Sequence, residues 1–184
     1  ELTRTRNEKT LNQLEIVYDV AGGEFDHHGI DKEYRDNGIP YAACGLIRRR
    51  YGRDVIKFKD SSLSEEEIEI VFENIDRKLI EGIDALDNGV RIEEGDIRIM
   101  NISSIISDFN PPWNSKREDE EAFNEAVEVT SAILRNTLDN RISVLKARAK
   151  IIRAYDKRTI PEVLVLEGYC PYRDTLLEID KNKE

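Results

Sequence analysis

The sequence is poor in several residue types that usually carry structure or chemistry. Its 184 residues include two cysteines, two histidines and one tryptophan. Cys44 and Cys170 lie far apart and form no CxxC pair, so we expect buried free thiols and neither a zinc site nor a disulfide framework. Free thiols fit a reducing compartment, and the sequence therefore favours a cytoplasmic location.

Long hydrophobic runs are also missing. No apolar stretch reaches the ~20 residues that a membrane-spanning helix needs, so the sequence predicts no membrane partner. Hydrophobic residues still make up 39% of the chain, which is enough for one soluble domain with a core.

Positive charge is in deficit, with 28 Lys and Arg against 38 Asp and Glu and a net charge of -10. A surface with this charge repels polyanions, which tells against a protein that binds nucleic acid stoichiometrically. A nuclease remains compatible, because a metal pair can supply positive charge at the scissile phosphate. The cluster Arg48, Arg49 and Arg50 could hold a strand, with Arg48 as the candidate substrate contact; the alternative, which we prefer, is a solvated helix face.

Both histidines stand together in the run Asp26, His27, His28. A pair of imidazole and carboxylate ligands suits borderline divalent ions such as manganese. Of two adjacent side chains, one can bind the metal while the other contacts the substrate. We therefore predict a metal site here. The alternative is a solvated, charged loop tip.

A second candidate metal ligand precedes this run. Residues 14–20 form a short apolar stretch that Ala21, Gly22 and Gly23 interrupt, which predicts a buried strand followed by a turn. Asp19 would then lie at the carboxyl end of a strand, where open parallel sheets bind ligands. A turn-capping aspartate is the alternative.

A long helical pattern supplies the third acidic position. Residues 41–51 predict a helix and 54–58 a strand or extended segment, and a further helix is expected from a Ser64–Glu67 capping box to the Asn88–Gly89 stop. Asp84 and Asp87 lie three residues apart on one face near its end, where acidic groups oppose the helix dipole. This placement favours a metal ligand role for at least one. Turn capping is the alternative for Asp87, and the sequence does not rank the two.

The remainder of the chain predicts structural elements. We expect a packed helix or strand pair over 96–106, a second capping box at Ser115 and Glu118, and a late strand over 163–166 before a frayed tail at 181–184. A helical pattern over 117–153 would extend about 55 Å, which predicts a kink or a protrusion. Its basic residues predict a solvated face, with phosphate contact as the alternative: Arg141, Lys146, Arg148, Lys150 and Arg153.

Several blocks resemble a known family. Residues 18–29 read Tyr-Asp-Val-Ala-Gly-Gly-Glu-Phe-Asp-His-His-Gly and are similar to the centre of the melanocyte proliferating gene (Myg) family, a branch of the DHH phosphoesterases. Further similar blocks follow in the family's order, and together they span nearly the whole chain. They are residues 41–52 and 84–89, then Asn110, Pro111, Trp113 and Asn114, then 169–172.

One departure from the family concerns the metal site. Family members carry an upstream His-x-x-x-x-His-x-Asp-Asp segment with further metal ligands, whereas this chain opens at Glu1 within the following block, Arg4-Thr5-Arg6. The family's carboxyl-terminal third also finds no counterpart, and no initiator methionine is present. We therefore expect this chain to be a piece of a longer protein.

The resemblance implies an α/β fold with a mainly parallel sheet flanked by helices, as in DHH phosphoesterases, and a long-helix extension. Residues 1–114 would form the metal-binding α/β domain, and 115–184 the helical extension with the late strand packing on it. No internal repeat or low-complexity linker separates the two.

The resemblance also implies a function, namely metal-dependent phosphodiester hydrolysis by a 3'-to-5' exonuclease that acts on single-stranded RNA or short oligonucleotides. Two divalent ions would be bound, manganese by preference or magnesium. Asp19, His27 and Asp84 or Asp87 would be metal ligands, Asp26 would orient or bridge, and His28 would contact the phosphate.

Other functions stay open. The same metal site could serve a manganese-dependent pyrophosphatase or a short-oligonucleotide phosphatase, and a loop without metal would leave a non-catalytic interaction protein. The sequence does not distinguish a monomer from a homodimer.

Overall fold

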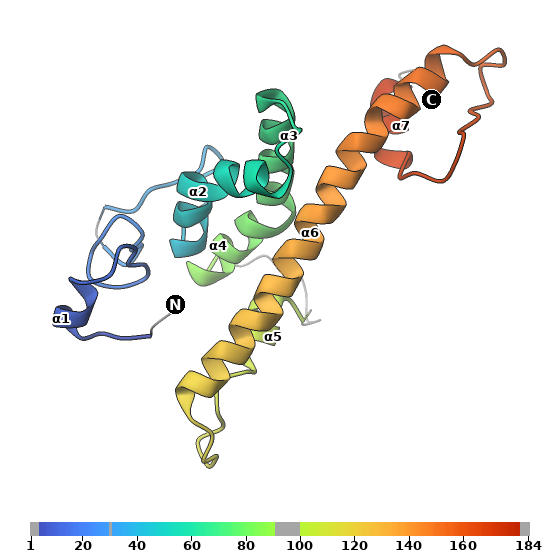
Figure 1. Ribbon diagram of the computed structural model, residues 1–184. Helices are drawn as coiled ribbons and strands as arrows, with labels where there is room; N and C mark the ends of the chain where they lie inside the picture. The colour runs from blue at the N-terminus through green and yellow to red at the C-terminus, as the bar shows by residue number, and fades with distance from the viewer. Residues whose placement is uncertain (1–3, 30, 91–99, 181–184) are drawn as a thin grey trace. The chain divides into compact units, whose positions relative to one another are not determined.

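The computed structural model describes residues 4–29, 31–90 and 100–180 and is mostly helical (Figure 1). Short helices come first, and the longest helix follows in the second half of the chain. In chain order the elements are α1 (Glu8–Leu11), α2 (Ala43–Lys59), α3 (Glu65–Ile75), the π-helix η1 (Asp76–Ile80), α4 (Glu81–Asp87), α5 (Ile102–Ser107), α6 (Asp119–Asp156) and α7 (Arg173–Ile179).

The predicted α/β fold with a mainly parallel sheet is wrong for these described residues. Their strand pairing is limited to two isolated bridges, Tyr18 with Phe25 and Tyr34 with Pro40. The stretch 14–20 therefore has no neighbouring strand, and Leu14 and Ile16 are exposed. An extended segment gains stability only where its backbone groups find partners, so apolar composition alone does not make a strand.

The two other predicted strands are also wrong. Residues 54–58 form the last part of α2, where Ile56 is buried on the helix face that packs into the core. Residues 163–166 lie in an irregular segment without strand pairing. The predictions for 96–99 and for 181–184 lie outside the described residues.

Several of the helical predictions are confirmed. A helix does start near residue 41, and Ser64 and Glu67 do form a capping box, with Glu67 N donating to Ser64 Oγ at 3.2 Å and Ser64 N to Glu67 Oε2 at 2.9 Å. Gly89 follows α4 with a left-handed φ of 73°, as the stop signal predicts. The π-helix η1 between α3 and α4 had no signal in the sequence.

The chain forms two compact units, Glu1–Leu134 and Arg135–Glu184, and α6 begins in the first and ends in the second. This helix is continuous over 38 residues, and the expected kink or protrusion stays a prediction. The functional division predicted after residue 114 stays a prediction. Among the described residues, no helix is both long and apolar enough to cross a membrane.

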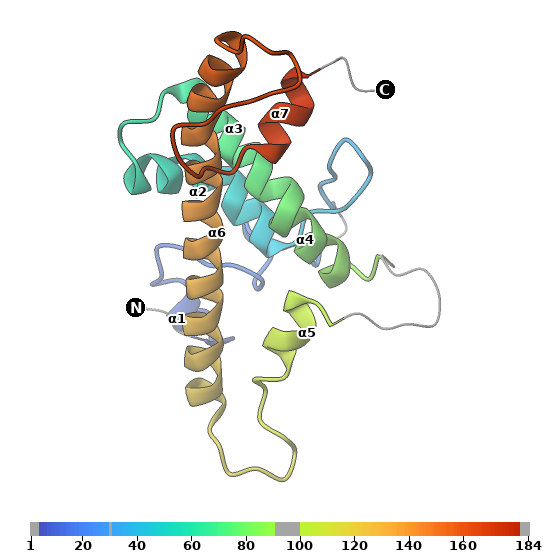
Figure 2. The same ribbon diagram turned by 90° about the vertical axis from the view of Figure 1, so that its right-hand side faces the viewer.

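The core of the first unit lies between α2, α3, η1 and α4. These helices are consecutive in the chain and lie together in two perpendicular views (Figures 1 and 2). The contact between α2 and α3 is close, because a Cβ added at Gly52 would lie 2.9 Å from Cε2 of Phe72. Each fully buried aliphatic or aromatic side chain contributes about 1.5–3 kcal/mol. Buried members are Leu46, Ile56, Ile68, Val71, Phe72, Ile75, Ile80 and Ala85.

The second unit combines the later part of α6 with α7, which lies beside the last turns of α6 (Figure 2). Arg148 Nη2 donates to Glu178 Oε1 at 2.8 Å, and Tyr155 Oη donates to Asp180 Oδ1 at 3.2 Å. Ile151 is completely buried on α6. These contacts attach α7 to the long helix.

Candidate functional site

The loop that carries Asp19 and both histidines is folded by unusual backbone geometry. Asp19 and Ala21 adopt left-handed φ values of 63° and 69°, in a region that residues with side chains rarely occupy. Asp19 N donates to Phe25 O at 3.0 Å and closes the loop over the buried Phe25 ring. Backbone strain of this kind costs about 1–3 kcal/mol per residue and is concentrated at functional sites.

Asp26 holds the loop together from inside. Its Oδ2 accepts a hydrogen bond from Gly22 N at 2.7 Å, and its Oδ1 accepts from His28 N at 3.0 Å and lies 2.8 Å from His28 Nδ1. The backbone hydrogen bonds from His28 and Gly22 lower the pKa of Asp26 to about 2. An ionised Asp26 therefore sets the orientation of the His28 ring through its contact with Nδ1.

The side chain of His27 is buried, with 9% of the residue exposed, and lies between two carboxylates. Its Nδ1 is 3.4 Å from Asp19 Oδ1 and its Nε2 is 3.1 Å from Asp87 Oδ2. The exposed His28 also approaches Asp19, with Nδ1 at 3.7 Å from Oδ1. The structure thus brings four of the predicted residues together, and we call Asp19, His27, His28 and Asp87 the Asp-His cluster.

Asp84 takes a different place. It is fully buried, its Oδ1 accepts from Gly45 N at 3.0 Å, and its Oδ2 accepts from Arg35 Nη2 at 2.5 Å. Arg35 also pairs with the buried Asp76 of η1. Burial raises the pKa of Asp84, while these hydrogen bonds oppose that effect. Asp84 is thus engaged with Arg35 and the start of α2, whereas Asp87, one turn later, reaches the Asp-His cluster.

Arg48 is not brought to this cluster. Its Nη2 donates to Phe72 O at 2.7 Å, its Nη1 lies 3.3 Å from Asp76 Oδ1, and its guanidinium covers the Phe72 ring. Only 10% of its side chain is exposed. The structure therefore gives Arg48 a packing role between α2 and α3 instead of the solvated position or substrate contact expected from the Arg48–Arg50 run.

The donor set of the Asp-His cluster fits a divalent cation. One atom from each of Asp19, His27 and His28 lies within 4.8 Å of the other two. Nδ1 of His27 is buried without a hydrogen-bond partner, although an imidazole in this position normally has one. Mixed carboxylate and imidazole donors suit manganese, zinc or iron, and a cation would offset the negative charge of the clustered carboxylates.

A cavity of about 530 Å³ in the first unit adjoins the cluster and includes Asp19 and Asp87 in its wall. Its volume is within the ~300–1,000 Å³ typical of small-molecule sites. Arg4 brings a positive charge to this wall, and Phe109 and Phe123 bring aromatic rings. No functional role was predicted from the sequence for these three residues, although Arg4 belongs to a block that resembles the Myg family.

Cys44 also lines this cavity, and its thiol is poorly activated. Burial, aided by the nearby Asp84 and Asp87, raises the pKa of its thiol to about 11. The thiolate needed for nucleophilic attack is therefore scarce near neutral pH.

Comparison with known proteins assigns the chain to a family. The family model MYG1_exonuc, described as "Uncharacterised protein family (UPF0160)", matches residues 1–184. The chain belongs to this family. It is 26% identical over 203 aligned residues to the MYG1 protein of Schizosaccharomyces pombe, covering 98% of this chain and 62% of that protein.

Two further relatives of this family agree. The MYG1 protein of Saccharomyces cerevisiae is 27% identical, covering 100% of this chain and 62% of that protein. The MYG1 exonuclease of Rattus norvegicus is 27% identical, covering 98% of this chain and 54% of that protein. The chain thus spans about three fifths or less of the length of these relatives. No solved structure matches it.

Proposed function

We propose that the protein is a metal-dependent phosphodiester hydrolase, a 3'-to-5' exonuclease that acts on RNA, and that its family is a branch of the DHH phosphoesterases. The observation that carries this proposal is the position of the buried His27 between the carboxylates of Asp19 and Asp87. The name of the rat relative, MYG1 exonuclease, supports a nuclease in this family.

The metal ligands in this proposal are Asp19, His27 and Asp87. Their donor atoms suit two divalent ions, manganese by preference or magnesium, with further ligands from the upstream segment of the family. Bound ions of this kind lower the pKa of a water and offset negative charge on phosphoryl oxygens. Asp84 has no part in binding them, because both of its oxygens accept hydrogen bonds from Gly45 and Arg35.

His28 contacts the scissile phosphate in this proposal. Its side chain is 61% exposed, and the contact of Asp26 Oδ1 with its Nδ1 at 2.8 Å fixes the ring. Such a contact contributes most when charge builds up on the phosphate, because a preorganised group need not rotate into place during the reaction. Asp26 is a positioning residue for His28.

The substrate in this proposal is single-stranded RNA or a short oligonucleotide, which places the protein in RNA processing. The cavity beside the Asp-His cluster offers Arg4 for a phosphate and Phe109 and Phe123 for a base. Aromatic rings bind bases by stacking without regard to sequence, which suits an exonuclease that removes every nucleotide in turn.

The test uses the full-length protein with single-stranded RNA labelled at its 5' end, in the presence of manganese. We expect labelled products that shorten one nucleotide at a time, and no reaction in the presence of a chelator. A 3' phosphate or a label that blocks the 3' end should stop the reaction. Products cut internally, or shortening from the 5' end only, would contradict the proposed polarity.

Substrate length distinguishes the second candidate, a phosphatase for short oligonucleotides. The cavity beside the cluster has a volume of about 530 Å³, which favours short substrates. If dinucleotides are cleaved much faster than long RNA at equal concentration, this second function is the better description.

A further inference from the structure

Charge is unevenly divided between the two compact units. Residues 1–134 contain 17 Lys and Arg against 30 Asp and Glu, whereas 135–184 contain 11 against 8. The corresponding net charges are -13 and +3. The unit with the Asp-His cluster therefore repels a polyanion, while the second unit attracts one.

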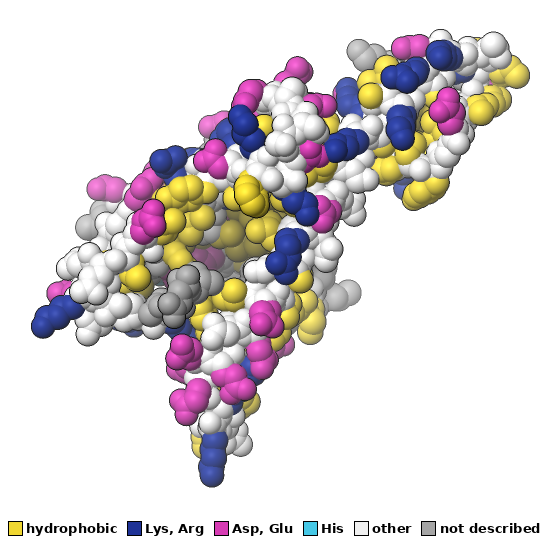
Figure 3. Space-filling view, viewed as in Figure 1, with side chains coloured by type: hydrophobic (Ala, Val, Ile, Leu, Met, Phe, Trp, Pro, Cys, Tyr) yellow, Lys and Arg dark blue, Asp and Glu magenta, His cyan; other side chains and the backbone are white. Residues whose placement is uncertain are grey.

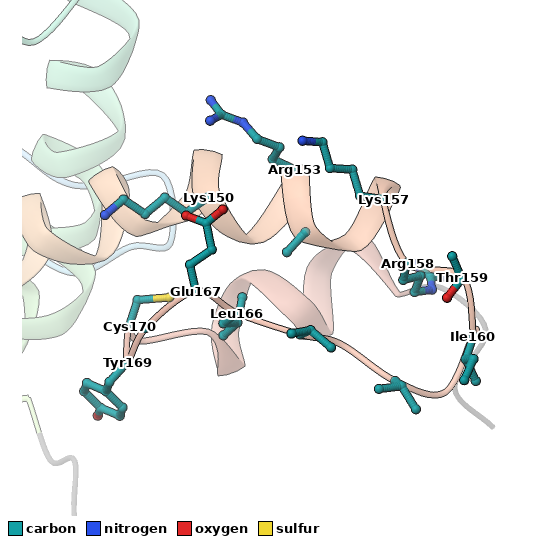
Figure 4. A pocket seen from close by; sticks show the side chains of 14 residues that line it. Lys150, Arg153, Lys157, Arg158, Thr159, Ile160, Leu166, Glu167, Tyr169 and Cys170 are labelled. Atoms are coloured by element: carbon teal, nitrogen blue, oxygen red, sulfur yellow. The ribbon is translucent and has the colours of Figure 1, made fainter.

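Three cations of the second unit lie at the end of α6. Lys150 and Arg153 are three residues apart on the same side of this helix, and Lys157 directly follows its last residue, Asp156. All three are exposed and line one cavity of about 590 Å³ (Figure 4). No carboxylate among the described residues forms an ion pair with any of them.

Stabilisation of the helix end accounts for only part of this cluster. Cations near a helix carboxyl terminus offset the dipole only within the last turn. Arg158 acts in this way, because its Nη1 donates to Tyr155 O at 3.0 Å and its guanidinium covers the Tyr155 ring. Arg153 lies in the last turn of α6, whereas Lys150 lies further from the end at Asp156. Neither forms an ion pair with a described carboxylate, so their charge is available to a ligand.

The rest of the cavity wall is apolar and aromatic. Tyr169 is 98% exposed, and in Figure 4 its ring projects away from the backbone. Ile160, Val163 and Val165 are also exposed along the same wall. In Figure 3, Lys and Arg side chains mix with hydrophobic ones over the end of α6 and over α7. Exposed cations and an exposed aromatic ring that line one cavity are a combination that binds single-stranded nucleic acid.

We propose that this cavity binds single-stranded nucleic acid. Lys150, Arg153 and Lys157 contact successive phosphates, and the ring of Tyr169 stacks on a base. Glu167 is the one carboxylate in the wall. Its negative charge repels a compact, highly charged anion more than an extended strand whose phosphates are spaced apart. The identity of the strand as substrate rests on the proposed function, but binding to this cavity does not require hydrolysis.

The first experiment measures equilibrium binding of a fluorescent, single-stranded RNA to the full-length protein without divalent metal, over a range of salt concentrations. The variant Lys150→Gln/Arg153→Gln/Lys157→Gln should bind at least tenfold more weakly. Each lost phosphate contact removes ~0.7 from the slope of log K against log salt for a single strand, so the slope should fall by about 2.

The matched control is Lys9→Gln/Arg77→Gln/Lys78→Gln, which removes the same charge from exposed positions of the first unit. This control should keep most of the affinity and the slope. Equal losses in both triple variants would show a general charge effect and overturn the site. Circular dichroism and thermal unfolding verify that both variants are folded.

A second experiment separates nucleic acid from other polyanions. Tyr169→Ala should weaken RNA binding about tenfold, because stacking on an aromatic ring is lost, and should leave binding of inorganic polyphosphate unchanged. Tyr34→Ala, at another exposed tyrosine, should change neither. If Tyr169→Ala leaves RNA affinity unchanged, or weakens both ligands equally, the assignment to nucleic acid is wrong.

The two proposals fail separately. RNA that binds through these residues but is never cleaved would contradict the exonuclease and leave the binding site standing. RNA that is cleaved by the full-length protein with unchanged affinity in the Lys150, Arg153 and Lys157 variant would overturn the binding site alone.

Discussion

The Nε2 atom of His27 lies 3.1 Å from Oδ2 of Asp87, which is the last residue of α4. This contact depends on how α4 is held. One turn earlier, Asp84 accepts hydrogen bonds from Arg35 and from Gly45 N at the start of α2. The buried Asp84 thus anchors the helix whose end presents Asp87 to His27.

Asp84 and Asp87 should therefore respond differently to the same change. Asp84→Asn should lower the free energy of unfolding by about 1–3 kcal/mol, because it removes one of the two carboxylates that pair with buried Arg35, the other being Asp76. Asp87→Asn should change it little but weaken manganese binding. Denaturant unfolding and calorimetric titration with manganese measure the two effects. Equal destabilisation by both variants would contradict this assignment.

Glycine is required at position 45 by the close approach of Asp84. A Cβ there would lie 1.9 Å from Asp84 Oδ2. Gly45→Ala should lower the free energy of unfolding by about 3 kcal/mol, since overpacked cores must shift. The control is Gly82→Ala, another helical glycine, whose Cβ would meet no atom within 4 Å. Gly82→Ala should raise the free energy of unfolding by up to about 1 kcal/mol, because alanine has a higher helix propensity than glycine. If Gly45→Ala leaves the free energy of unfolding unchanged, Asp84 is not held against α2.

Acid should release the loop that Asp26 organises. Its pKa is lowered from 3.8 to about 2, so its contribution to stability is complete above about pH 4 and is lost as the pH falls through 2. Asp26→Asn should lack this part of the acid dependence. Carbon NMR of the Asp26 carboxyl group measures the pKa directly. A value at or above 3.8 would show that the hydrogen bonds from Gly22 and His28 are not formed in solution.

The two histidines should separate metal binding from turnover in the full-length protein. His27→Ala should abolish both manganese binding and hydrolysis, because it removes a metal ligand. His28→Ala should keep the metal and lower the rate by about 10²-fold or more, because it removes a contact to the developing charge. Metal analysis and RNA hydrolysis of both variants test this.

Folding provides the control for these substitutions. Because His27 is buried, some loss of stability is expected for His27→Ala, while the exposed His28 should tolerate alanine. Unchanged hydrolysis in both variants would contradict the catalytic roles.

The sequence alone determined the features that depend on neighbouring residues. The Ser64–Glu67 capping box and the Gly89 stop were predictable, because capping and left-handed turns are decided within a few residues. The pairing of Asp26 with His28 is equally local. The same holds for the selection of Asp19, His27 and the Asp84–Asp87 pair as candidates, which followed from residue type and position.

Only the tertiary structure decided between residues that look alike in the sequence. Asp84 and Asp87 share one helix face, but Arg35 and Gly45, which are distant in the chain, engage the first and leave the second for His27. Arg48 is buried by Phe72 and Asp76 for the same reason. The apolar stretch 14–20 forms no strand because strand formation requires a partner. Burial, ion pairing and strand pairing all depend on what the folded chain places nearby, which local sequence does not specify.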